Sequence, residues 1–181
     1  MIEFGSVCPR RITVLCGDTY RRAMSLLFLV KTPLLNRRRM RTLLREMDVI
    51  RSVARYLRDE KRYDVEAVES VYERGPDIIA RSPKLKHELA IEAKGQTSSK
   101  SDSNRFGKEF NKNQKEDHLG RALVKALQFV SKGKITGIAL PSDETDVALV
   151  NSIKPALERL GVVVFLVRMD KTVEIGVGKL P

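Results

Sequence analysis

The sequence lacks the residues on which several common kinds of site depend. It has no Trp, two His and two Cys among 181 residues, and both cysteines, Cys8 and Cys16, lie near the N-terminus. We therefore expect neither a disulfide framework nor a zinc site with paired Cys and His ligands in the rest of the chain. No Ser-His-Asp arrangement or Gly-rich phosphate loop is visible, and His87 and His118 are expected to be structural or exposed.

Long apolar runs are also missing. No stretch approaches the roughly 20 apolar residues that span a bilayer, so no membrane partner is expected. The short apolar stretch at 26–30 comes too late for a secretory signal peptide. We expect a cytoplasmic protein, although the Arg-rich, acid-poor start of the chain is also compatible with a mitochondrial-type targeting segment.

Positive charge is concentrated at the start of the chain. Residues 1–40 hold eight Lys or Arg and two Asp or Glu, whereas residues 41–181 hold 26 and 21. A basic balance favours polyanionic partners such as DNA, RNA or anionic membranes. We predict a basic, poorly structured extension over 1–40, which could derive from an upstream start codon. Residues 41–181 are long enough for one domain with a core.

Periodicity predicts an α/β domain. Apolar residues recur in steps of three and four between Leu43 and Leu57, which indicates an amphipathic helix. Two more helices are predicted over His118–Val130 and Asp146–Leu160, the second ending at Gly161, with Pro155 marking a kink or a restart near Ser152. The predicted strands are Tyr63–Tyr72, Asp77–Arg81, Lys86–Lys94, Lys134–Leu140, Val162–Val167 and Thr172–Val177, of which Val162–Val167 is expected to be central and the last to be an edge strand.

The strands Asp77–Arg81 and Lys86–Lys94 bring three charged residues together. Side chains alternate along a strand, so Glu92 and Lys94 project from the same face. If the two strands pair antiparallel, the start of one meets the end of the other, and Asp77 lies beside Glu92. Two carboxylates can hold a hard cation such as Mg²⁺ or Mn²⁺, and a lysine beside them can orient water or neutralise a phosphate.

These residues resemble the signature of the PD-(D/E)XK nuclease superfamily. The match consists of Pro76-Asp77, a gap of fourteen residues, and Glu92-Ala93-Lys94. The resemblance implies a restriction endonuclease-like αβββαβ core with a mixed central sheet flanked by helices. It also implies that Asp77 and Glu92 bind the metal, that the Ala93 carbonyl is a further ligand, and that Lys94 acts on the attacking water. A glutamate on the first helix often joins such sites, and Glu46 is the candidate here.

The resemblance implies metal-dependent hydrolysis of phosphodiester bonds in DNA, of the endonuclease type, in restriction, repair or recombination. A single-site nuclease that cuts both strands often works as a dimer, so a homodimer is compatible with this function. The alternative is a catalytically inactive module of the same fold that binds nucleic acid or a partner protein. A regulatory subunit that uses its basic N-terminal arm is a third option.

Further residues are candidates for contact with nucleic acid. Gln96 would share the face of Glu92 and Lys94 if the strand continued, although Gly95 makes a turn at least as compatible. Arg121, Lys125 and Gln128 form one polar ridge on the predicted helix, which either faces the site or is solvated. The polar segment Gly95–Asp117 leaves directly from the site strand, and it is expected to be either disordered or a mobile flap with Phe106 and Phe110 as stacking groups.

Overall fold

The structure, a computed structural model, describes residues 43–67, 75–82, 84 and 87–181. The predicted extension over 1–40, the second half of the predicted first strand and Pro83 lie outside these residues. The elements are α1 (Glu46–Asp59), β1 (Asp64–Ala67), β2 (Ile78–Arg81), β3 (Glu88–Ala93), α2 (Lys112–Val130), β4 (Ile135–Pro141), α3 (Glu144–Arg159), β5 (Val162–Val167) and β6 (Val173–Val177). Their types and order confirm the predicted α/β class.

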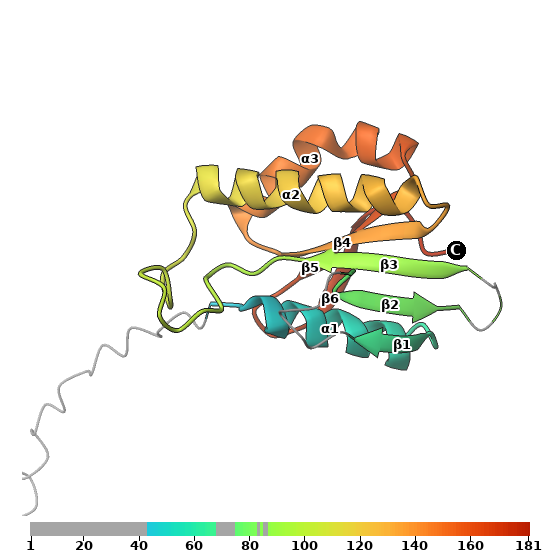
Figure 1. Cartoon of the computed structure of the whole chain (residues 1–181), viewed down its shortest axis with the longest axis horizontal. Coiled ribbons are helices and arrows are strands. Elements are labelled where there is room, and N and C mark those ends of the chain that lie inside the picture. The colour runs from blue at the N-terminus through green and yellow to red at the C-terminus, as the bar shows by residue number, and fades with distance from the viewer. Residues whose placement is uncertain (1–42, 68–74, 83, 85–86) are drawn as a thin grey trace, which may run out of the picture. The chain divides into compact units, whose positions relative to one another are not determined.

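All six strands form one mixed sheet in which neighbours in sequence are neighbours in space (Figure 1). β1, β2 and β3 pair antiparallel, β3, β4 and β5 pair parallel, and β6 pairs antiparallel with β5. Every residue of β5 is buried, as its continuous apolar run predicts, although β5 is the fifth of six strands and not central as expected. β6 lies at the edge, also as predicted.

Helices cover both faces of the sheet. The connections β3–α2–β4 and β4–α3–β5 link parallel strands and step in the same direction along the sheet. Because such connections are right-handed, α2 and α3 lie on the same face of the sheet (Figure 1). Their apolar side chains pack with those of β4 and β5 around Ile138 and Val164. On the other face α1 packs against β2, β3 and β5 around Ile78, Ile91 and Phe165. In the described part of the chain, no helix has the length and apolarity needed to cross a membrane.

α2 and α3 show the main differences from the predicted helices. α2 begins at Lys112, six residues before the predicted start, because Asn111 caps it: the Asn111 side chain accepts from the Gln114 N–H at 3.0 Å and the Gln114 side chain accepts from the Asn111 N–H at 3.1 Å. α3 runs unbroken through Pro155, so the predicted restart is wrong. Gly161 follows α3 with φ of +67°, the left-handed conformation of a helix-ending glycine.

Candidate functional site

The candidate site lies where β2 begins and β3 ends. The two strands pair antiparallel with Ile78 opposite Ile91, which confirms the predicted pairing. The Asp77 N–H donates to the Ile91 carbonyl at 2.9 Å, and the Asp77 carboxylate accepts from the Ala93 N–H at 2.6 Å. The Pro-Asp turn and the Glu-Ala-Lys strand end are therefore in contact through backbone and side chain.

Glu92 is a buried carboxylate with two unequal oxygens. Its side chain is 1% exposed, and its Oε1 accepts from Lys94 Nζ at 2.5 Å and from Lys125 Nζ, on α2, at 2.7 Å. Its Oε2 is buried and has no hydrogen-bond partner among the described residues. Lys94 Nζ also donates to the Ala93 carbonyl at 2.8 Å. The Lys94 ammonium thus contacts both Glu92 and Ala93, whose oxygens the resemblance assigns to a metal.

Burial and the charge of Glu92 raise the pKa of two carboxyl groups at the site, Asp77 and Glu46. Burial raises the pKa of Asp77 to about 6, and the negative charge of Glu92 adds to this, while the Ala93 N–H and Lys94 oppose it. Burial also raises the pKa of Glu46, against the opposing charge of Lys94 and together with the charge of Glu92. Asp77 and Glu46 both lie near the charge of Glu92 in poorly solvated surroundings, which favours a bound proton or cation.

Glu46 is brought to the site by a close approach between α1 and the end of β3. The Gln96 N–H donates to the Leu44 carbonyl at 2.8 Å, and the Leu44 N–H donates to Gln96 Oε1 at 2.9 Å. Gly95 makes this approach possible, because a Cβ there would lie 2.4 Å from the Glu46 nitrogen and 2.8 Å from the Arg45 carbonyl carbon. The first residue of α1 therefore lies next to the strand that carries Glu92 and Lys94.

Of the residues predicted to contact nucleic acid, only some lie at the candidate site. Lys125 lies in the site, against Glu92, whereas Arg121 and Gln128 are exposed on α2. Of the two readings of Gln96, the structure agrees with a turn: Gln96 follows the end of β3, it is 4% exposed, and its side-chain nitrogen donates to Asp143 at 3.0 Å. Its amide is used inside the protein, so we assign it a structural role in place of a nucleic-acid contact.

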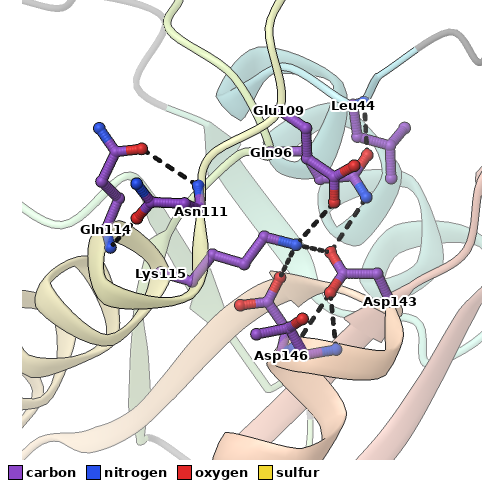
Figure 2. Close-up of polar contacts among 9 residues, drawn as sticks. Leu44, Gln96, Glu109, Asn111, Gln114, Lys115, Asp143 and Asp146 are labelled. Atoms are coloured by element: carbon purple, nitrogen blue, oxygen red, sulfur yellow. Dashed lines mark hydrogen bonds and ion pairs between the residues drawn. The ribbon is translucent and has the colours of Figure 1, made fainter.

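Gln96 belongs to a buried polar network around Lys115 (Figure 2). Lys115 is 5% exposed, and its Nζ donates to Asp143 at 2.7 Å and to Glu109 at 2.8 Å, with Asp146 at 3.7 Å. The other oxygen of Asp143 caps α3 by accepting from the Thr145 and Asp146 N–H groups. This network joins the loop after β3 to the first turns of α2 and α3.

The two aspartates of this network have opposite pKa shifts. For Asp143, burial is outweighed by hydrogen bonds from Asp146, Lys115 and Gln96, and its pKa falls to about 2. Burial raises the pKa of Asp146 to about 8, and the hydrogen bond and charge of Asp143 add to this. The pair therefore shares one proton at neutral pH, as expected for two carboxylates in contact.

His118 lies closer to the site than the sequence suggested. Together with Glu46 and Phe110 it lines a cleft of about 340 Å³ beneath the loop that follows β3. Burial and the charges of Lys94 and Arg121 lower its pKa. The seven-residue spacing of His118 and Lys125 was the available signal, since it places both on one face of α2 two turns apart.

Within the described residues, no group of three or more His, Cys, Asp or Glu side chains is spaced as a ready-made metal site. A Mg²⁺ ion, however, needs only one or two protein carboxylates, because water and phosphate oxygens complete its shell. The unpartnered Oε2 of Glu92 is an acceptor that such an ion would satisfy, and oxygen donors from Asp77 and Ala93 suit a hard cation. The donor set therefore fits Mg²⁺ or Mn²⁺.

Comparison of the sequence with protein-family models found no match, and neither did comparison with curated proteins. The function of the site is therefore argued from its own chemistry.

Proposed function

We propose that residues 41–181 form a metal-dependent nuclease domain that hydrolyses phosphodiester bonds in DNA. The observation that carries this proposal is the convergence of Asp77, Glu92 and Lys94 at one end of β3, through the contacts of 2.6 and 2.5 Å described above. The order α1-β1-β2-β3-α2-β4 is also the αβββαβ order implied by the resemblance to PD-(D/E)XK nucleases. It supports a restriction endonuclease-like core.

Each residue has a role that its surroundings support. Asp77, Glu92 and the Ala93 carbonyl would hold Mg²⁺ or Mn²⁺, with Glu46 as a third carboxylate. When bound, the ion would polarise the phosphate and lower the pKa of a water molecule. Lys94 is positioned to orient that water or to neutralise the phosphate, and Lys125 supplies a second positive charge at the same carboxylate. Because Glu92 is buried, it interacts with these ammonium groups more strongly than it would in water, although Lys125 is itself 47% exposed.

Cleavage assays test this proposal directly. Supercoiled plasmid, linear duplex, single-stranded and branched DNA are incubated with the protein and Mg²⁺, and then with EDTA. We expect cleavage with Mg²⁺ only, and a loss of about 100-fold or more for Lys94→Ala and for Asp77→Asn. Lys132→Ala is the matched control, because Lys132 is exposed beyond the end of α2. Cleavage that survives EDTA, or that Lys94→Ala leaves unchanged, contradicts the metal mechanism.

One observation favours a second candidate function. Lys94 and Lys125 already neutralise Glu92 through the same oxygen, so the carboxylate has its charge partners without a metal. A module of this fold that only binds nucleic acid or a partner protein would need no metal to balance the charge of Glu92. DNA binding without cleavage in either Mg²⁺ or Mn²⁺, unaffected by Asp77→Asn, would support this second candidate.

A further inference from the structure

The cleft beside the candidate site is built from the loop that follows β3, the start of α1 and one face of α2. Its volume is about 340 Å³, close to the lower end of the roughly 300–1,000 Å³ range of small-ligand sites. This is room for one nucleotide and excludes a base-paired duplex. The lining residues used below are Glu46, Ser99, Lys100, Arg105, Phe110 and His118.

The cleft adjoins the candidate site, because Gly95, the residue after Lys94, lines it. Glu46 also lines it, and the charges of Lys94, Glu92 and Lys125 all affect the pKa of the Glu46 carboxyl, which burial raises. His118 also lines the cleft, and burial lowers its pKa, with the charge of Lys94 adding to this. A strand whose scissile phosphate lies at Glu92 and Lys94 would therefore place an adjoining nucleotide at the mouth of the cleft.

The lining of the cleft suits the two parts of a nucleotide. Lys100 and Arg105 supply positive charge, and Ser99 supplies a hydroxyl, which together match a phosphate and its sugar. Phe110 and His118 supply aromatic surface, with their ring centroids 4.5 Å apart in an edge-to-face arrangement. A base can stack on such a surface whatever its sequence, provided that it is unpaired.

The loop that forms the cleft is held in place by its own contacts. Thr97 is buried, and its hydroxyl donates to the Arg105 carbonyl at 3.0 Å. Ser98 and Phe106 form a bridge across the loop, and the Phe110 N–H donates to the Gln96 carbonyl at 2.8 Å. Phe110 and Arg105 are therefore presented to the cleft by a folded segment that is tied to the end of β3.

We propose that this cleft binds one unpaired nucleotide next to the scissile phosphate, so that the domain prefers DNA with a single-stranded segment, such as an overhang or a flap, over blunt duplex. The placement of the scissile phosphate rests on the proposed nuclease function. The binding of an unpaired nucleotide does not, because it depends on the cleft alone.

Binding without catalysis isolates the cleft. Fluorescence anisotropy in EDTA measures the affinity of the full chain for labelled oligothymidylate of about 12 nucleotides, for blunt duplex and for duplex with a single-stranded overhang. We expect tighter binding of the single strand and the overhang than of the blunt duplex, by about tenfold or more. Phe110→Leu, which keeps apolar packing and removes the ring, should weaken single-strand binding by about 5- to 100-fold.

Two further variants complete the test. Arg105→Ala should weaken binding of the single strand, whereas Lys132→Ala, exposed beyond α2, should have the small effect of a remote charge. Phe110→Tyr keeps the ring and should retain single-strand affinity, and an unfolding temperature of Phe110→Leu close to that of the wild type separates lost stacking from a folding defect. Equal affinity for blunt duplex and single strand, or a Phe110→Leu protein that binds as the wild type does, overturns the proposal.

The outcome is distinguishable from that of the nuclease proposal. If the protein never cleaves DNA but prefers unpaired DNA through Phe110, the cleft proposal is supported and the nuclease proposal is contradicted. If the protein cleaves blunt and overhanging DNA equally and Phe110→Leu has no effect, the nuclease proposal is supported and the cleft proposal is contradicted.

Discussion

Gly95 is the residue on which the geometry of the site most directly depends. The end of β3 and the start of α1 approach so closely that a Cβ at this position would meet backbone atoms of Glu46 and Arg45 at 2.4 and 2.8 Å. Backbone atoms cannot rotate away as the end of a flexible side chain can. Relief would require α1 to move away from the strand that carries Glu92, and Glu46 would move with it.

Gly95→Ala should therefore destabilise the protein by about 1–3 kcal/mol, as overpacking of a tight contact does. Gly120→Ala is the matched control, because Gly120 lies in α2, where an added Cβ would meet nothing within 4 Å, and a helix interior favours Ala by about 0.5–1 kcal/mol. Urea unfolding of both variants should show opposite signs. Two stabilising or two neutral effects would contradict the close approach described here.

Asp146 is the residue whose protonation should be visible in stability. Its folded pKa of about 8 lies far above that of an unfolded aspartate, about 4, so the folded state holds an extra proton between these values. The stabilisation from this group is fully present below about pH 4 and is lost as the pH rises through 8. Lys115, Asp143 and Glu109 are the charged groups that surround it.

Asp146→Asn keeps a neutral side chain at this position and should remove that pH dependence. We expect the free energy of unfolding of the wild type to fall more steeply from pH 5 to pH 9 than that of the variant, by an amount on the order of a few kcal/mol. Urea titrations at both pH values measure it. Glu158→Gln, an exposed position on the same helix, should follow the wild type. A slope that Asp146→Asn leaves unchanged argues against a shared proton.

At the scale of elements, the features that depend on residues close together in the sequence could be predicted. The order of helices and strands followed from periodicity, and the meeting of Asp77 with Glu92 followed from side-chain alternation and antiparallel pairing of neighbouring strands. The first turns of α2 were missed because residues 112–117 carry no apolar stripe. The cue was the reciprocal cap of Asn111 and Gln114, and the buried residue there is a lysine, Lys115.

Contacts between distant segments explain the remaining differences. Lys125 is 33 residues from Glu92, and Gln96 is 47 residues from Asp143. Periodicity places Lys125 on the correct helix face but does not say which strand end that face meets. For Gln96 the sequence left a nucleic-acid contact and a turn open, because a single sequence does not reveal that Leu44 and Asp143 bind its side chain.

Pro155 makes α3 less stable than its sequence would otherwise allow. The helix continues through this exposed proline, which has no N–H to donate to the carbonyl of Asn151. A proline in a helix interior is about 3 kcal/mol less favourable than alanine, and part of this difference is offset because proline also restricts the unfolded chain.

Pro155→Ala should therefore raise the free energy of unfolding by about 1–2 kcal/mol, measured by urea titration. Ala156→Gly, at the neighbouring exposed position, should lower it by about 1 kcal/mol and so reports that the helix is formed there. A loss of stability in Pro155→Ala would show that the proline suits a bend at this position.

At the scale of the whole molecule, positive charge is unevenly distributed along the chain. The described helices, the sheet and the candidate site lie in residues 43–181, which carry a small net positive charge. Residues 1–40 carry a net charge of +6, about half of the total of +11. Folding and catalysis should therefore depend on one part of the chain, and salt-sensitive attraction to DNA on both.

A chain that begins at Arg41 should unfold at the same temperature as the full chain and should cleave saturating DNA at a similar rate. Its affinity for DNA should fall, and the slope of log K against log salt concentration should become less steep, because each lost phosphate contact removes about 0.9 from that slope. Thermal unfolding and anisotropy titrations at several salt concentrations measure the two effects separately. A large fall in the unfolding temperature would show that residues 1–40 contribute to the core, and an unchanged salt slope would show that their positive charge does not contact DNA.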